Sequence, residues 1–147
     1  MSKIILIADA TCRVPNANIK GRAGYGHASC GFLILDELDN ILHQGSEYLG
    51  DMTVPRAEMK GLITGMECAP AFGRDELEVR MDSELVIKWM NGLYRMKKDE
   101  IRILFDQVKI KEKRFNKVIY MWHNRNAKWA READKLANQK YSEMHSG

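Results

Sequence analysis

Residues 77–86 read Leu-Glu-Val-Arg-Met-Asp-Ser-Glu-Leu-Val, and this stretch decides the fold class. Apolar and polar side chains alternate from Leu77 to Asp82, as in a β-strand with one buried and one polar face. Ser83 suits the N-cap of a following helix, because its hydroxyl can accept a hydrogen bond from the first turn. A strand that leads directly into a helix predicts an α/β domain. The carboxylate of Asp82 falls at the junction, where such domains gather their ligands.

Strand and helix patterns continue on both sides of this stretch. Before it, apolar runs predict three strands, at Lys3–Ala10, Gly24–Asp36 and Ile41–Tyr48. The second and third of these strands are expected to form a hairpin. A segment rich in Asn, Pro and Gly predicts a loop at Cys12–Arg22. Further patterns predict helices from Pro55, from Ser83 and around Ile101–Phe115, a strand at Val118–Trp122 and a helix at Ala127–Met144. This order predicts one α/β domain over residues 1–147 with a mixed sheet and a frayed C-terminal tail.

The composition narrows the class of protein. The chain has 147 residues, a formal net charge of +3, 29% charged residues and 45% hydrophobic residues, which indicates a soluble globular protein. No apolar run approaches the ~20 residues of a membrane span, and Ile4–Ala8 is shorter than the apolar region of a signal peptide, about 7–15 residues. Three cysteines without a close pair predict reduced thiols and an intracellular, cytoplasmic location.

The charge is unevenly distributed. Residues 1–94 have a net charge of −4, residues 95–117 of +5 and residues 118–147 of +2. A basic block beside an acidic body is typical of a phosphate-binding face, although a solvated helix surface explains the same charges.

Four acidic residues stand at predicted strand ends or in predicted helices: Asp9, Glu58, Asp82 and Asp134. Because the carboxyl ends of strands meet at one edge of an α/β sheet, we expect Asp9 and Asp82 to converge. Carboxylates that pack together raise one another's pKa unless a cation lies between them. Oxygen ligands of this kind select Mg²⁺ or Mn²⁺, and no Cys/His pairs have the spacing of a zinc site.

The local sequences of these acids form a larger pattern, in the order Ile7–Cys12, Val54–Glu58, Met81–Val86 and Ala133–Asn138. Together they resemble the motifs of type 1 ribonuclease H, and the resemblance covers about Ile4 to Asn138. It implies a ribonuclease H-like fold, a five-stranded mixed sheet of three antiparallel and then parallel strands flanked by helices. No separate hybrid-binding domain is expected.

The resemblance also implies a mechanism. In that family, four acids hold two Mg²⁺ ions about 3.5–4 Å apart, with Mn²⁺ as a substitute. Asp9 would bridge both ions. Asp134 would complete the coordination of the ion on the side of the attacking water, and Glu58 and Asp82 would complete that of the ion beside the leaving group. The family's substrate is the RNA strand of an RNA–DNA hybrid, which is cut to leave 5′-phosphate and 3′-hydroxyl ends.

Further residues are candidates for substrate contacts or proton transfer. Those expected to contact the hybrid are Thr11, Cys12, Arg13, Asn16, Arg56, Ser83, Trp89, Asn91, Lys97 and Lys98. Among them, the residues after the first strand suit the 2′-hydroxyls of RNA, and the two lysines suit DNA phosphates. His123 matches a catalytic histidine that many family members have after the last strand, although a structural residue at the strand end is the alternative. We expect Leu85, Val86, Trp89 and Trp122 to pack in the core.

Some positions depart from the family pattern. Two asparagines that usually precede Arg-x-Glu are replaced by Val54 and Pro55, a glutamine by Glu84, and an asparagine before the last acid by Ala130. The departures affect substrate contacts and leave the four acids in place. Two alternatives therefore stay open, a metal nuclease of the same fold that acts on DNA or branched nucleic acid, and a binding module without catalysis. We expect a monomer that needs no protein partner.

Overall fold

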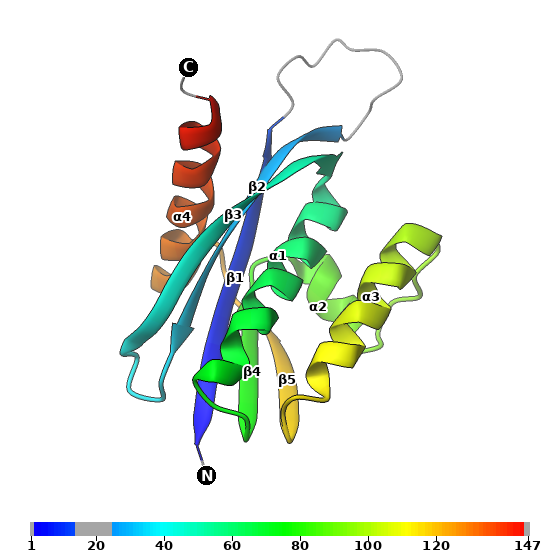
Figure 1. The fold of residues 1–147 in the computed structure, drawn as a ribbon. Helices are drawn as coiled ribbons and strands as arrows, with labels where there is room; N and C mark the ends of the chain where they lie inside the picture. The colour runs from blue at the N-terminus through cyan, green and yellow to red at the C-terminus, as the bar shows by residue number, and fades with distance from the viewer. Residues whose placement is uncertain (1, 14–24, 146–147) are drawn as a thin grey trace.

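The sheet has five strands in the order β3-β2-β1-β4-β5 (Figure 1). The structure, a computed structural model, describes residues 2–13 and 25–145. The strands are β1 (Lys3–Arg13), β2 (Tyr25–Leu35), β3 (Ile41–Thr53), β4 (Glu76–Met81) and β5 (Lys117–Trp122). β1 to β3 pair antiparallel, whereas β4 pairs parallel with both β1 and β5. The predicted mixed sheet is thereby confirmed.

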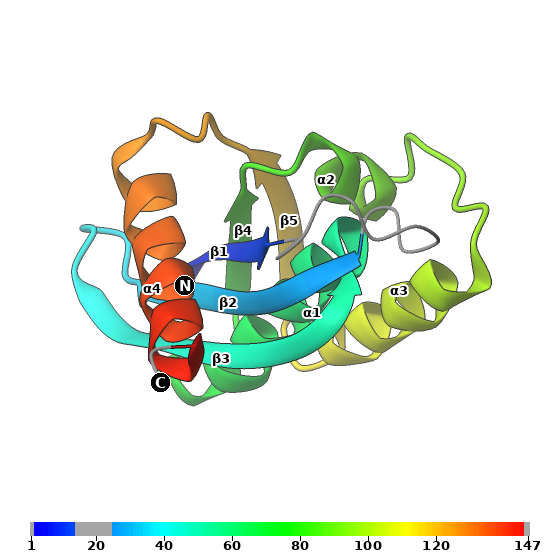
Figure 2. The same ribbon diagram turned by 90° about the horizontal axis from the view of Figure 1, so that it is seen from above.

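Helices cover both faces of the sheet. They are α1 (Val54–Cys68), α2 (Glu84–Met90), α3 (Asp99–Glu112) and α4 (Lys128–His145), with a short 3₁₀-helix at Ala69–Ala71. Figures 1 and 2 show α4 on one side of the sheet and the other three helices on the opposite side. No helix among the described residues has the length and apolar character needed to cross a membrane.

The central strand β1 explains this layered arrangement. Ile4 and Leu6 pack into the core beneath α1, α2 and α3, whereas Ile5 and Ile7 pack with Ala133 of α4. Successive side chains of a strand point to opposite faces, so a continuous apolar run predicts a strand covered on both sides. Asp9 follows this run and lies on the α4 side of the sheet because it shares the parity of Ile5 and Ile7.

Two strands are longer than the sequence pattern predicted. Cys12 and Arg13 were expected in a loop, but they pair with Ala28 and His27 of β2. β3 was expected to end at Tyr48, but it continues through Gly50, whose positive φ of 86° accompanies an irregularity in its pairing with β2. A glycine adopts such a φ without strain. The rest of the expected loop, residues 14–22, and the end of the expected tail, residues 146–147, lie outside the described residues.

Gly31 fixes the distance between α4 and the sheet. A Cβ atom at this position would lie 2.5 Å from the carbonyl oxygen of Ala133 and 2.6 Å from the backbone nitrogen of Ala137. Gly31 also pairs with Asp9 across β1 and β2. The close approach therefore holds α4 directly against the part of the sheet that carries Asp9.

We expect Gly31→Ala to lower the free energy of unfolding by about 1–3 kcal/mol, because the methyl group would force the α4 backbone outward. Urea unfolding followed by circular dichroism measures this change. Gly73→Ala is a matched control, since its Cβ would meet only side-chain atoms of Ile4, the nearest at 3.1 Å. Equal losses in the two variants would contradict the close packing of α4.

Candidate active site

Asp9, Glu58, Asp82 and Asp134 line one pocket of about 510 Å³, which we call the acid pocket. They come from four different elements: β1, the first turns of α1, the junction of β4 and α2, and α4. The structure thus brings together all four acids that the sequence analysis selected. Among the described residues, no three or more His, Cys, Asp or Glu side chains already form a compact metal-ligand group.

Asp9 is the most buried of these acids, with 7% of its surface exposed. Its Oδ1 accepts a hydrogen bond of 2.9 Å from the backbone N–H of Ala10. Burial, followed by the negative charge of Asp82, raises the pKa of Asp9 to about 8. A cation in the pocket would offset both effects. The donor set, all carboxylate oxygen, therefore fits Mg²⁺ or Mn²⁺.

Ser83 connects Glu58 to the start of α2. Its hydroxyl donates a hydrogen bond of 2.6 Å to Glu58 Oε2 and accepts one of 3.2 Å from the backbone N–H of Val86. The same side chain therefore caps α2, as predicted, and orients a carboxylate of α1. Burial raises the pKa of Glu58, although the hydrogen bond from Ser83 opposes this rise.

The end of β5 supports the strand end that carries Asp82. Trp122 Nε1 donates a hydrogen bond of 3.1 Å to the carbonyl oxygen of Asp82. The prediction that Trp122 lies in the core is wrong, because 46% of its surface is exposed. The prediction that Leu85 lies in the core is also wrong, because 37% of its surface is exposed where the first turn of α2 directs it toward solvent. Val86 and Trp89 are buried as predicted.

His123 is held at the end of β5. Its backbone N–H donates a hydrogen bond of 3.0 Å to the carbonyl oxygen of Met81, and its side chain is not among those that line the acid pocket. Burial lowers the pKa of His123. This position favours the structural alternative, and a catalytic role for His123 stays a prediction.

The residues after Asp9 divide into two groups. Thr11 and Cys12 line the acid pocket, and the Cys12 thiol donates a hydrogen bond of 3.3 Å to the carbonyl oxygen of Met52. Arg13 turns to α4 instead, where its Nη2 donates a hydrogen bond of 2.6 Å to Asn138 Oδ1 and its guanidinium lies 4.6 Å from the ring centroid of Tyr141. Asn16, a further predicted substrate contact, lies outside the described residues.

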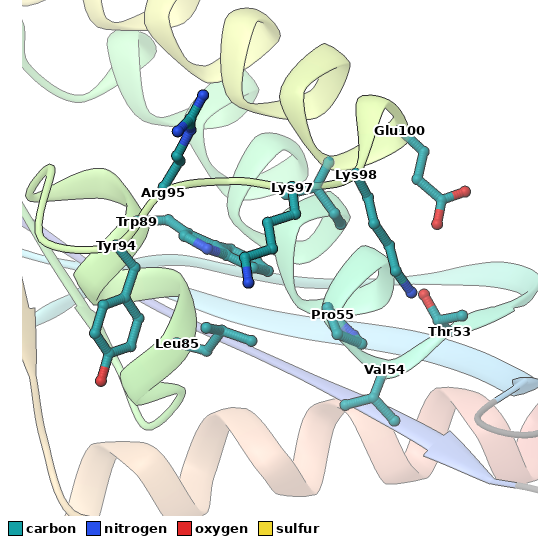
Figure 3. A pocket seen from close by; sticks show the side chains of 11 residues that line it. Thr53, Val54, Pro55, Leu85, Trp89, Tyr94, Arg95, Lys97, Lys98 and Glu100 are labelled. Atoms are coloured by element: carbon teal, nitrogen blue, oxygen red, sulfur yellow. The ribbon is translucent and has the colours of Figure 1, made fainter.

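A second hollow of about 630 Å³ lies beside the acid pocket, and we call it the basic groove (Figure 3). Its lining is mostly apolar, with cations at the rim: Thr53, Val54, Pro55, Leu85, Trp89, Tyr94, Arg95, Lys97, Lys98, Glu100 and Ile101. Figure 3 shows Lys97 and Lys98 extending over the groove from the connection between α2 and α3. Val54 lines both hollows, so the acid pocket and the basic groove adjoin.

Four of the described residues predicted to contact substrate lie outside both hollows: Arg13 and Ser83, described above, and Arg56 and Asn91. Asn91 donates a hydrogen bond of 3.2 Å from Nδ2 to the carbonyl oxygen of Tyr120, which ties the end of α2 to β5. Arg56 has a buried Nε without a hydrogen-bond partner among the described residues. Three polar residues of the acid pocket, Arg125, Asn126 and Arg131, were not among the candidates from the sequence. The sequence signal that could have identified them is the group of basic and amide side chains within the ten residues before Asp134.

Known proteins resemble this chain over most of its length. A family model described as reverse transcriptase-like matches residues 18–140. A bifunctional protein of Mycobacterium tuberculosis is 31% identical over 136 residues, which make up 92% of this chain. A ribonuclease HI of Halobacterium salinarum is 32% identical over 81 residues, 55% of this chain and 41% of that protein. The chain spans only 35% of the length of the mycobacterial relative.

Solved structures share the fold. The N-terminal RNase H domain of a Mycobacterium tuberculosis protein, solved as a fusion with maltose-binding protein, has a TM-score of 0.85 and 26% identity, with full coverage of both chains. LC11-RNase H1, in complex with an RNA/DNA hybrid, has a TM-score of 0.83 and 31% identity, covering 96% of this chain and 98% of that one. The motif order, the sheet topology and these matches agree, and the chain belongs to the type 1 ribonuclease H family.

Proposed function

We propose that this chain is an endonuclease that hydrolyses the RNA strand of RNA–DNA hybrids and leaves 5′-phosphate and 3′-hydroxyl ends. The observation that carries the proposal is the acid pocket, which four carboxylates enter from four elements in the order of the family's motifs. Carboxylates alone would repel a phosphodiester, so their convergence favours a site that binds cations for catalysis.

The four acids would hold two Mg²⁺ ions or, as substitutes, two Mn²⁺ ions. When bound, the ions activate a water for attack on the phosphate and stabilise the departing 3′ oxygen. The chain supplies a fixed arrangement of ligands. Asp9 is buried and feels the charges of both Asp82 and Asp134, which suits a ligand shared by both ions. Ser83 holds the Glu58 carboxylate through its hydrogen bond of 2.6 Å.

The basic groove offers a path for the DNA strand of the hybrid. It adjoins the acid pocket at Val54, so one bound duplex can occupy both hollows. Lys97 and Lys98 are placed to neutralise phosphates, and Trp89 supplies an apolar surface for sugars. Thr11 and Cys12 line the pocket on the side where the RNA strand would pass. Their backbone groups would recognise its 2′-hydroxyls.

A nuclease that acts on DNA or branched nucleic acid is the second candidate. Val54 and Pro55 favour it, because they line the groove where the family's two asparagine amides would contact bases. Cleavage of equal amounts of labelled hybrid, double-stranded RNA, duplex DNA and a four-way junction, each with Mg²⁺ or EDTA, separates the two. The hybrid should be cut only with Mg²⁺, and preferential cutting of the junction would replace the first proposal by the second.

We expect a Lys97→Ala/Lys98→Ala double variant to bind the hybrid more weakly. Each lost phosphate contact should reduce the slope of log affinity against log salt concentration by about one. Fluorescence anisotropy at several salt concentrations measures this slope. Lys109→Ala/Lys113→Ala, in the same basic block but outside the groove lining, is the control. An unchanged slope in the first variant would place the DNA path elsewhere.

We expect His123→Ala to slow cleavage of the hybrid only modestly, because His123 lies at the strand end and does not line the acid pocket. Steady-state kinetics on a hybrid with one cleavable ribonucleotide segment measures the effect. A loss of turnover as large as that of an acid-pocket variant would show that His123 is catalytic.

A further inference from the structure

Two arginines face the acid pocket from the segment between β5 and Asp134. Arg125 lies in a turn in which Asn124 Oδ1 accepts a hydrogen bond of 2.8 Å from the backbone N–H of Asn126. The backbone N–H of Ala127 closes the same turn by donating a hydrogen bond of 2.9 Å to the carbonyl oxygen of Asn124. Figure 2 shows this connection leaving the carboxyl end of β5 and crossing toward α4. The turn thus holds Arg125 in the lining of the pocket.

Arg131 reaches the same pocket from the first turns of α4. It precedes Asp134 by three residues, and residues three apart share a face of a helix. Its backbone N–H donates a hydrogen bond of 3.0 Å to the carbonyl oxygen of Ala127, so the turn and the helix form one continuous hydrogen-bonded unit. Both arginines are therefore placed by local backbone structure.

Neither guanidinium is paired with a pocket acid. Among the described residues, no ion pair and no side-chain hydrogen bond joins Arg125 or Arg131 to an acid, although four acids line the same pocket. Elsewhere in the chain such pairs do form, as between Arg80 and Glu78 at 2.6 Å. Both arginines are exposed, so their N–H donors are free to meet an anion from solution.

The charge of the filled pocket favours a phosphate as that anion. Four ionised carboxylates and two divalent cations would cancel, so the charge that remains is that of the two arginines. Arginine presents several N–H donors in a planar fork that matches phosphate oxygens. Arginine does not deprotonate in proteins, so its part is electrostatic and not that of a proton shuttle.

We propose that Arg125 and Arg131 bind the non-bridging oxygens of the phosphate at the cleavage position and hold the same phosphate as the 5′-phosphate of the product. The proposal rests on the proposed function, because it assumes that the acid pocket is the cleavage site. In this proposal Arg125 contacts the reacting phosphate, a role distinct from the proton transfer for which His123 is a candidate.

Kinetics of Arg125→Ala and Arg131→Ala on a hybrid with one cleavable segment test the proposal. Each variant should lose about tenfold or more in kcat, with a smaller change in KM, because the donors act on charge that develops in the transition state. Arg→Lys variants should recover part of the loss, since lysine restores the charge without the fork. Arg114→Ala is the control, an exposed arginine after α3 at the opposite ends of the parallel strands.

Two calorimetric titrations provide readouts that do not depend on turnover. Mn²⁺ should bind both alanine variants at least as tightly as the unaltered protein, because arginine is not a metal ligand and its positive charge repels a cation. A 5′-phosphorylated trinucleotide, added with Mg²⁺, should bind the alanine variants about tenfold more weakly than it binds the Arg114→Ala control.

A trinucleotide affinity or a kcat within about twofold of the control would overturn the assignment. A loss of Mn²⁺ binding would also overturn it, because it would show that the arginines only support the fold of the pocket. An unaltered protein that fails to cut the hybrid would contradict the proposed function instead. The trinucleotide titration would still decide whether the arginines bind phosphate.

Discussion

Asp9→Asn is expected to reduce cleavage of an RNA–DNA hybrid by more than about a hundredfold while the protein stays folded. Asp9 is a buried residue of the acid-pocket lining, and its carboxylate is the ligand that both ions would share. Asparagine has the same shape but is neutral, so it removes the strongest attraction for the cations. Burial and the charge of Asp82 raise the pKa of Asp9 to about 8, which shows that the ionised carboxylate is costly to bury. Replacing this carboxylate by a neutral amide should therefore raise the Tm of the variant above that of the unaltered protein at pH 8 and above.

Cleavage rates and thermal unfolding, measured on the same preparations, check both parts of this expectation. Asp106→Asn is the control, because Asp106 is an exposed acid on α3 that does not line the acid pocket. It should leave both the rate and the Tm unchanged. An active Asp9→Asn variant would contradict the role of Asp9, and a variant with a lower Tm would contradict the account of its burial.

The free energy of unfolding should depend on pH through Asp9 when divalent cations are removed. The pKa of Asp9 is raised from 3.8 in the unfolded chain to about 8 in the folded protein. The folded state therefore binds this proton more tightly, so its stabilising contribution is full below about pH 4 and is lost as the pH rises toward 8. The expected loss is a few kcal/mol, since one pKa unit corresponds to about 1.4 kcal/mol.

The difference between the unaltered protein and Asp9→Asn isolates this contribution. Urea unfolding of both proteins in EDTA, from pH 5 to 9, should show their free energies of unfolding diverging as the pH rises. Mg²⁺ at pH 8 should stabilise the unaltered protein more than the variant, because a cation that binds only the folded state raises its stability. Parallel pH profiles in the two proteins would contradict the raised pKa of Asp9.

Some of this site could be predicted from local pattern and topology alone. The alternation before Asp82 and the apolar run before Asp9 identify two strands, and parallel strands bring their carboxyl ends together. Glu58 and Asp134 lie in helices that approach from opposite faces of the sheet, and no local pattern indicates which helical acids face a pocket. Their assignment depended on the motif order of the family.

Other features could not be predicted because they depend on hydrogen bonds that the sequence pattern does not show, most of them between residues far apart in the sequence. Arg13 appeared free to contact substrate, but the structure joins it to Asn138, which is 125 residues away. Trp122 fitted an apolar pattern, but its indole N–H reaches the carbonyl oxygen of Asp82 and keeps the ring partly exposed. Arg125 lay in a predicted loop, and only the hydrogen-bonded turn places it in the pocket.

The uneven charge of the chain has a simple structural basis. Of the basic block at residues 95–117, the described cations in the groove lining are Arg95, Lys97 and Lys98. Lys109 and Lys111 instead form ion pairs with Glu112 and Glu67, at 3.3 and 3.0 Å. The block therefore lies partly on the groove that we propose binds the DNA strand and partly on the surface of α3.

The most direct test of the central claim is the cleavage of one labelled RNA strand, annealed either to DNA or to complementary RNA. With Mg²⁺, we expect the strand to be cut only when it is paired with DNA, and each cut to leave one end with a 5′-phosphate and one with a 3′-hydroxyl. No cut in the hybrid, or equal cutting of both duplexes, would contradict this claim.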